Sequence, residues 1–183
     1  MSFWSFFRPA CMLLLTITFL TGILYPLFIT SIAQWTMPDR ANGSLLFNNG
    51  KVVGSSLIGQ GFKKEEYFHP RPSAVDFDPI KPAGGSNLGP TSKKLQAIVN
   101  QRMKQLPSSP PSELVYASGS GLDPHLSLAA IYYQIDRVAK ARNIENTQQL
   151  YFLVDSLKEG FLHSYVNVLL LNQSLDYQFP MKN

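Results

Sequence analysis

Residues 10–33, ACMLLLTITFLTGILYPLFITSIA, form a stretch in which almost every side chain is apolar. No Asp, Glu, Lys or Arg lies between Arg8 and Asp39. At about 1.5 Å per residue this stretch reaches roughly 36 Å as a helix, which crosses a hydrocarbon core of about 30 Å with some tilt. The backbone N–H and C=O groups of a helix are satisfied internally. The stretch therefore predicts a transmembrane helix.

A cleaved signal peptide is the alternative, because Ser31-Ile32-Ala33 has the small residues of a cleavage site. The apolar region of a signal peptide is about 7 to 15 residues long. The run in this chain is longer, which favours an anchor that stays in the mature protein. Cys11 lies before the apolar run rather than after it, so a lipoprotein signal does not fit; as the only cysteine it forms no internal disulfide.

Two features inside the span have structural consequences. Pro26 lacks a backbone donor, so we expect a bend near residues 24–26. Small and hydroxyl side chains in the span either allow close packing with another membrane helix or bond to their own helix carbonyls. These residues are Thr16, Thr18, Thr21 and Gly22.

The segment before the span is short and carries Arg8 as its only charged side chain. The basic residues after the span are more numerous, but long domains translocate largely regardless of their charge. We therefore expect residues 1–9 to be a short cytoplasmic N-terminus, residues 10–33 the transmembrane helix, and residues 34–183 a periplasmic domain. Such a chain is a single-pass protein of a bacterial inner membrane.

The composition of the 183 residues is that of a globular chain, with 45% hydrophobic and 15% charged residues and a formal net charge of +4. This length suits one domain plus an additional element. The lysines and arginines are dispersed rather than gathered in a stripe, and a membrane anchor would hold the domain away from the genome. Nucleic acid is therefore not an expected partner.

Beyond the span, strand and helix patterns alternate. SLLF and KVVGSSLIG flank Asn49-Gly50, which favours a two-residue hairpin turn. Helical spacing is found in residues 92–106, 127–142 and 147–158, the first of them beginning at Pro90 or Thr91. ELVYAS and YVNVLLLNQSL are predicted to be strands. The predicted fold class is α+β: one N-terminal transmembrane helix followed by a single small-sheet domain with about three helices.

Residues 61–90 are rich in proline and glycine, so no helical periodicity survives there. Loops of this length are usually either functional or disordered. Aromatic side chains argue for order, because they offer surface to bury: Phe62, Tyr67, Phe68 and Phe77. We expect a structured binding loop.

The segment SGSGLDPHLS, residues 118–127, precedes the helix expected at 127–142. Either Asp123, followed by Pro124, or Ser127 can cap a helical turn. Gly119 and Gly121 allow the backbone to turn freely, which exposes N–H donors at a helix N-terminus, where an anion is favoured. Asp123 and His125 are also a candidate acid–base pair for a membrane-anchored hydrolase. The other histidines show no metal-ligand spacing, so no metal site is expected.

Several short blocks follow one another in an order that resembles the C subunit family of Kdp-type potassium-transporting ATPases. The blocks are VGSSLIGQGF, YFHPRPSA, GGSNLGPTS, SGSGLDPHLS, QIDRVAKAR and VNVLLLN. The similarity covers nearly the whole chain, including the N-terminal helix. It departs from the family pattern at Ala83, Ser92 and Leu128 and lacks a Gly-Glu-Pro-like turn between residues 161 and 165, which affects turn details.

The resemblance implies an inner-membrane potassium-transport complex that contains a channel-like potassium-binding subunit, a P-type ATPase subunit and a small fourth subunit. It further implies an accessory, non-catalytic subunit needed for assembly, which acts as a catalytic chaperone raising the ATP affinity of the ATPase subunit. The chain would have no cofactor of its own, and ATP would enter through a ternary complex. An outer domain meets cytoplasmic ATP only if this role is indirect or the topology is reversed.

Two groups of residues are candidate sites. A nucleotide or interface loop is predicted at Gln60, Gly84, Gly85, Ser86 and Asn87. The segment GGSNLGPT also fits turn-and-cap chemistry before a helix, and we favour this structural interpretation. An interface is predicted at Ser118, Gly119, Ser120, Gly121, Asp123 and His125. A nucleotide-binding regulator is therefore an alternative function beside the hydrolase. The basic net charge does not favour a role in collecting potassium ions.

Overall fold

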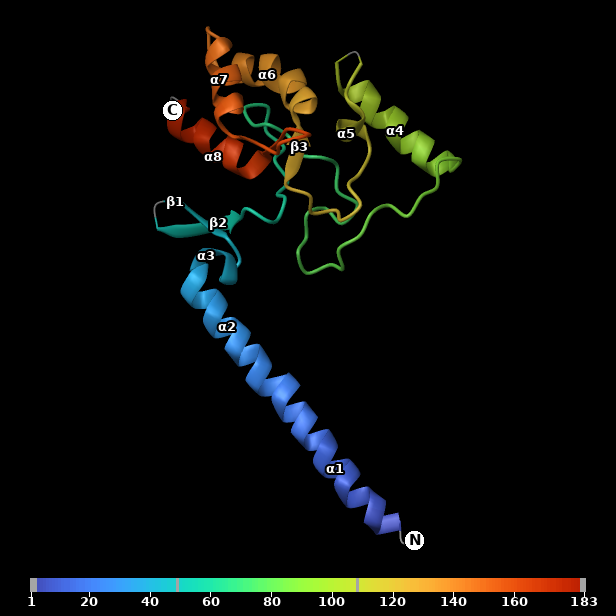
Figure 1. Ribbon diagram of the computed structural model, residues 1–183. Helices are drawn as coiled ribbons and strands as arrows, with labels where there is room; N and C mark the ends of the chain where they lie inside the picture. The colour runs from blue at the N-terminus through green and yellow to red at the C-terminus, as the bar shows by residue number, and fades with distance from the viewer. Residues whose placement is uncertain (1–2, 49, 108, 182–183) are drawn as a thin grey trace. The chain divides into compact units, whose positions relative to one another are not determined.

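The computed structural model of the protein describes residues 3–48, 50–107 and 109–181. The chain divides into two units, Met1–Leu45 and Leu46–Asn183 (Figure 1). The first unit is almost entirely helical. The second combines helices with two small sheets, which confirms the predicted α+β class.

The first unit is built around one continuous helix. It comprises α1 (Phe3–Phe19), the π-helical turn η1 (Leu20–Leu24) and α2 (Tyr25–Thr36), and the short α3 (Pro38–Ala41) follows. Residues Phe6–Thr36 are long and apolar enough to cross a membrane. The wide turn lies directly before Pro26, where the missing N–H interrupts regular α-helical bonding. Thr21 Oγ1 donates to Ile17 O at 2.8 Å, so this threonine bonds within its own helix.

A hairpin formed by β1 (Leu45–Asn48) and β2 (Lys51–Ser55) starts at the last residue of the first unit and belongs otherwise to the second. The predicted turn falls partly on Asn49, which lies outside the described residues. Gly50 has a φ of 76°, a left-handed conformation that glycine adopts without strain. The strands therefore form where the apolar stretches predicted them.

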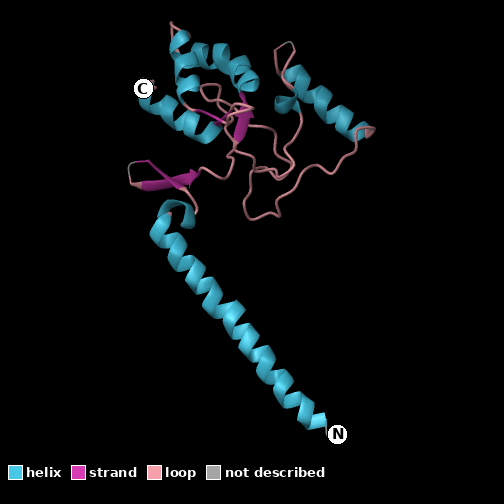
Figure 2. Ribbon diagram, in the orientation of Figure 1, coloured by secondary structure: helices cyan, strands magenta, loops and turns pink. Residues whose placement is uncertain are grey.

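No helix or strand occupies the described chain between β2 and α4 (Lys93–Gln105), as Figure 2 shows. This confirms the predicted irregular segment. The helix starts later than Pro90 or Thr91, because the Ser92 side chain accepts a hydrogen bond from Leu95 N and caps it.

The stretch ELVYAS is not a strand. Residues Ser112–Val115 form one helical turn, α5, which Tyr116 N closes by donating to Ser112 O at 2.9 Å. Its apolar residues Leu114 and Val115 are both buried. Adjacent buried residues satisfy a strand between two layers and a buried helical turn equally well, which is why the pattern was misleading.

A three-stranded antiparallel sheet lies in the order β3-β5-β4. Its strands are β3 (His125–Ser127), β4 (Lys158–Glu159) and β5 (Tyr165–Asn167), with Leu126 opposite Val166. Each outer strand leads into or out of a helix: α6 (Leu128–Arg142) follows β3, and α7 (Gln148–Ser156) precedes β4. The sheet thus gathers the helix ends at one place.

The predicted final strand is wrong beyond its first three residues. The chain turns at Asn167 into α8 (Val168–Gln178), because the Asn167 side chain accepts from Leu169 N at 3.1 Å and Leu170 N at 3.2 Å. This is N-cap chemistry inside an apolar run. The leucines that follow therefore belong to a helix whose first turns are buried on most sides.

The core of the second unit lies among α6, α7, α8 and the three-stranded sheet (Figure 1). Phe68, from the irregular segment, is completely buried in it. Fully buried aliphatic side chains surround this ring; among them are Ile131, Ile135, Val138, Leu150, Val154, Val166, Leu171 and Leu175.

Candidate functional site

Side-chain amides from two helices hold the irregular segment that contains Phe68. Gln134 of α6 accepts from His69 N at 2.8 Å and donates to His69 O at 3.1 Å. Asn172 of α8 does the same for Phe68, with both distances 2.9 Å. Two consecutive residues thus receive a pair of hydrogen bonds each, as they would in a sheet.

Two arginines of α6 donate hydrogen bonds to backbone carbonyls of the residues that precede Phe68. Arg137 donates to Glu65 O at 2.6 Å and Tyr67 O at 2.9 Å, and lies 3.5 Å from the Glu65 carboxylate. Arg142 donates to Glu66 O at 2.8 Å. Burial lowers the pKa of the Arg137 guanidinium, while the Glu65 charge opposes this shift. The blocks YFHPRPSA, QIDRVAKAR and VNVLLLN are therefore contact partners in one polar network.

The network continues to the C-terminal end of α8. Arg142, whose side chain is almost fully buried, pairs with Asp176 at 2.6 Å and lies 5.0 Å from the centre of the Tyr67 ring. Tyr67 OH donates to Asp176 at 3.0 Å. Burial and this carboxylate together raise the pKa of the Tyr67 phenol. Sequence reasoning assigned no role to Arg137 or Arg142. The pattern that could have indicated one is the presence of polar residues between the apolar positions of α6.

Of the predicted interface residues, those from Ser118 to Asp123 lie in a loop that bonds mainly to itself and to its neighbours, while His125 begins β3. Ser118 Oγ accepts from Gly121 N at 2.9 Å, and Ser120 Oγ accepts from Leu122 N at 3.1 Å. Ser127, rather than Asp123, caps α6, since its hydroxyl accepts from Ala130 N. The backbone N–H groups of Gly121 and Leu122 are thus hydrogen-bonded within the loop and do not face an anion.

Asp123 and His125 do not form a direct side-chain hydrogen bond. Their Oδ1 and Nδ1 atoms are 3.7 Å apart, while Oδ1 accepts from the His125 backbone N–H at 3.0 Å. The other carboxylate oxygen accepts from Arg71 Nη1 at 3.1 Å, and the His125 ring packs edge-on against Tyr165. This arrangement organises a turn. Arg71 Nε is buried there without a hydrogen-bond partner.

The structure brings the two predicted loops together. Gly84 N donates to Ser120 O at 2.8 Å, and a Cβ added at Gly85 would lie 3.4 Å from Gly119. Gly121 has a φ of 71°, and a Cβ added to it would lie only 2.9 Å from Gly84 O. The Gly84 amide is therefore not available to a phosphate. Asn87 has a φ of 52°, so the loop turns sharply after this contact.

Gln60 belongs to a different environment from residues 84–87. Its Nε2 donates to Val53 O at 2.8 Å and so ties the chain to β2. Gln60 also lines a cavity of about 480 Å³ with Lys63, Ser73 and Phe77. Ser86 instead lines a cavity of about 230 Å³ that includes Lys94 and Arg102. Ser86 thus shares a cavity with two cationic side chains, whereas Gln60 shares its cavity with Lys63.

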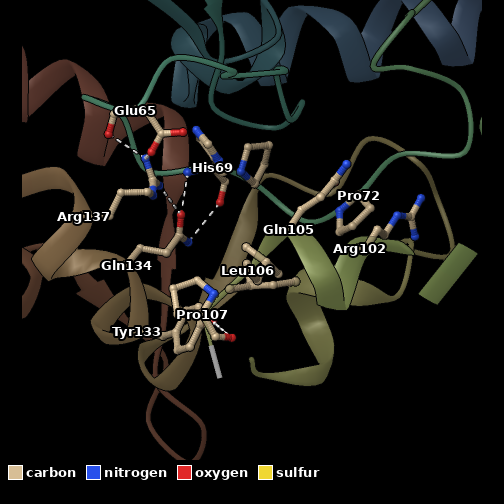
Figure 3. A pocket seen from close by; sticks show the side chains of 12 residues that line it. Glu65, His69, Pro72, Arg102, Gln105, Leu106, Pro107, Tyr133, Gln134 and Arg137 are labelled. Carbon is tan, nitrogen blue, oxygen red and sulfur yellow. Dashed lines mark hydrogen bonds and ion pairs between the residues drawn. The ribbon is translucent and has the colours of Figure 1, made fainter. Parts of the chain in front are cut away.

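A further cavity, of about 380 Å³, lies between α4 and α6 (Figure 3). The figure shows Arg102 and Gln105 on one side, opposite Gln134 and Arg137 on the other. Burial lowers the pKa of Arg102 and of His69, the latter also through the nearby Arg137 charge. Sequence reasoning did not identify this cavity, since it arises from segments far apart in the chain. Among the described residues, no cluster of three or more His, Cys, Asp or Glu could hold a metal ion.

Comparison with known proteins places these features in one family. Residues 7–177 match the family model described as "K+-transporting ATPase, c chain", KdpC. Proteins named potassium-transporting ATPase KdpC subunit are similar over nearly the full length. The one from Rhodospirillum rubrum is 43% identical (95% of this chain, 96% of the relative), that from Sorangium cellulosum 45% (92% and 96%), and that from Yersinia enterocolitica 41% (97% and 96%).

Proposed function

Because this chain belongs to the KdpC family, it is an accessory subunit of a potassium-transporting ATPase complex, and we propose that it is needed for assembly and raises the ATP affinity of the ATP-hydrolysing subunit. The observation that supports this most is that the family match includes both the apolar helix and the second unit. Both parts of the chain therefore belong to the function.

The proposed partners are a channel-like potassium-binding subunit, the P-type ATPase subunit and a small fourth subunit. In this proposal the helix Phe6–Thr36 crosses the bilayer once beside these subunits, and the second unit lies on the periplasmic side. Leu14, Leu20 and Phe28 are exposed side chains along the helix, as expected for a surface that meets lipid or another membrane helix.

The chain itself is proposed to be non-catalytic. Both carboxylate oxygens of Asp123 accept hydrogen bonds that hold the turn, from Arg71 and from the His125 backbone. A general base must reach the proton that it removes, and a carboxylate engaged in this way serves positioning. This geometry favours the accessory role over a hydrolase that uses Asp123 and His125.

Direct nucleotide binding is the second candidate function. The supporting observation is the cavity where Ser86 lies with Lys94 and Arg102, because two cations suit a phosphate. A periplasmic location would make any effect on cytoplasmic ATP indirect. Saturable ATP binding to the purified full chain, lost in Lys94→Gln, would favour this candidate, and its absence would leave the indirect role.

The proposed function is tested by comparing complexes with the full chain and with a chain that ends after Thr36. We expect the truncated chain either to prevent co-purification of the pump subunits or to raise the KM for ATP of potassium-stimulated hydrolysis. A complex that assembles normally and hydrolyses ATP with an unchanged KM would contradict the proposal. Asp123→Asn is the companion variant, which should leave hydrolysis intact once the chain is folded.

A further inference from the structure

The cavity between α4 and α6 contains a cation without an anionic partner. Arg102 Nη1 donates to the neutral carbonyl Val115 O at 2.7 Å. A guanidinium has five N–H donors in a planar fork, so one such bond leaves most of them free for other acceptors. In the part of the chain that the structure describes, no carboxylate forms an ion pair with Arg102.

Arg137, across the cavity, is in the opposite situation. Its two terminal nitrogens donate to Glu65 O, Tyr67 O and Gln134 Oε1, and the Glu65 carboxylate lies 3.5 Å away. The terminal nitrogens of Arg137 are therefore used for contacts within the protein. The cavity is lined by two positive charges and one negative charge, and the Glu65 side chain is 68% exposed. Potassium would be repelled by this balance, and an anion attracted.

The remaining lining is mostly apolar. Leu106, Leu114 and the Tyr133 ring contribute to it together with Pro70, Pro72 and Pro107. The Tyr133 hydroxyl donates to Pro107 O at 2.7 Å and is thus occupied, which leaves the ring as the surface offered to a ligand. A volume of about 380 Å³ lies in the range of small-molecule sites, which are typically apolar with a few polar groups.

We infer that this cavity binds a small organic anion, a carboxylate or phosphate monoester on a single ring, whose charged group pairs with Arg102 while the ring lies against Leu106, Tyr133 and the prolines. A planar guanidinium recognises carboxylate and phosphate groups through two parallel hydrogen bonds. The bound anion would connect α4, which carries Arg102, to α6, which carries Tyr133. The site is independent of the proposed transport role.

The test uses the purified full-length chain in detergent, with phenyl phosphate and benzoate as probes and benzyl alcohol as the uncharged analogue. Titration calorimetry should detect saturable binding of both anions and weaker binding of benzyl alcohol. Inorganic phosphate should also bind more weakly than phenyl phosphate, because it lacks the ring. Arg102→Gln should reduce the affinity for both anions about tenfold or more, as expected for a lost charge-assisted hydrogen bond.

Control variants separate the cavity from general charge and from folding. Lys104→Gln removes one charge from the same helix without altering the lining, so affinity should stay unchanged. Lys94→Gln alters the neighbouring cavity with Ser86 and should likewise have no effect. Gln105→Glu adds a negative charge at the exposed edge of the cavity, leaves the bond from Arg102 to Val115 O in place, and should weaken binding.

Three results would overturn the inference. One is absence of saturable binding by both anions. Another is equal binding of benzyl alcohol and benzoate. The third is an affinity that Gln105→Glu leaves unchanged or that Lys94→Gln reduces as much as Arg102→Gln does. Because binding is measured without the pump subunits, loss of the transport proposal would not affect this result, and the converse also holds.

Discussion

The side chain of Asn172 forms two hydrogen bonds of 2.9 Å with the backbone of Phe68, a residue 104 positions earlier in the chain. Asn172 is 1% exposed and Phe68 is fully buried. A buried backbone N–H and C=O need partners, and no strand of the described chain pairs with this segment. The Asn172 side-chain amide supplies both hydrogen bonds that a neighbouring strand would otherwise supply to Phe68.

The same solution recurs one residue later with Gln134 and His69. Together the two amides let an irregular segment enter the core and place the Phe68 ring among α6, α7 and α8. The polar residues of α6 and α8 are therefore structural requirements of the loop that they hold.

Replacement of Asn172 by leucine should strongly destabilise the second unit. Leucine has a similar size but no hydrogen-bonding group, so Phe68 N and Phe68 O are left buried without partners. We expect the free energy of unfolding to fall by about 2 to 6 kcal/mol, since each of the two unsatisfied groups costs about 1 to 3 kcal/mol. Urea unfolding of the full chain in detergent, followed by circular dichroism, measures this change.

Gln178→Leu is the matched control, because it makes the same kind of change at an exposed position of the same helix. Its free energy of unfolding should stay within about 0.5 kcal/mol of the wild type. Equal stability of Asn172→Leu and Gln178→Leu would contradict the assigned role of the amide.

The contact between the loops at residues 84–85 and 118–121 predicts a difference between two glycines. Gly121→Ala should be destabilising, because the residue has a φ of 71° and the added Cβ would lie 2.9 Å from Gly84 O in the other loop and 2.7 Å from Val75 Cγ2. Gly119→Ala should be close to neutral, since a Cβ there meets nothing within 4 Å. Thermal unfolding of both variants measures the difference. Similar melting temperatures would show that the loops do not pack as described.

His69 predicts a dependence of stability on pH. Burial, and then the Arg137 charge, lower the pKa of the folded imidazole below its ordinary value of 6.5. The unfolded chain therefore takes up the proton first as the pH falls. Stability from the neutral imidazole is complete above about pH 6.5, declines as the pH falls through the folded pKa, and then levels off.

This pH dependence is measured as the free energy of unfolding between pH 8 and pH 4 for the wild type and His69→Gln. The variant should lose the part of the slope that lies below about pH 6.5. Gln178→Leu should retain the wild-type slope. A wild type and a His69→Gln variant with identical profiles would disprove the assignment.

The proposed orientation predicts which residues an impermeant thiol reagent reaches in cells. In a Cys11→Ser background, Lys81→Cys should react with an impermeant maleimide in spheroplasts, since Lys81 is about half exposed and lies in the second unit. Trp4→Cys should react only after the membrane is opened. The reverse pattern would place the second unit in the cytoplasm and make direct contact with ATP the simpler mechanism.

Much of the fold was predictable from local patterns. Two local patterns predicted helices: the apolar run around Leu20, and the spacing of Leu128, Ile131 and Ile135. Both can be recognised because a helix repeats about every 3.6 residues, within a short stretch of sequence. The run after Asn167 was not predictable as a helix, since residues that are apolar on every side suit a buried strand and a buried helix alike. There the decision came from a cap and from tertiary packing.

The candidate site was predictable only in part. The proximity of Gly84 to Ser120 followed from no spacing in the sequence, although both loops were singled out by composition. In the sequence, Arg102 is one of several basic residues in the helical stretch 92–106, and its spacing does not distinguish it from the lysines. Its position opposite Arg137 depends on how α4 and α6 meet across an irregular segment, which no local pattern encodes.

This chain is an accessory subunit of a potassium-transporting ATPase complex, and we propose that its apolar helix keeps it in the membrane. Affinity purification of the full-length tagged chain from detergent-solubilised membranes of its own cells, followed by mass spectrometry of intact subunits, tests both statements together. We expect an untrimmed chain in fixed proportion with a channel-like subunit and a P-type ATPase subunit. A chain trimmed after Ala33 and recovered alone from the soluble fraction would contradict both statements.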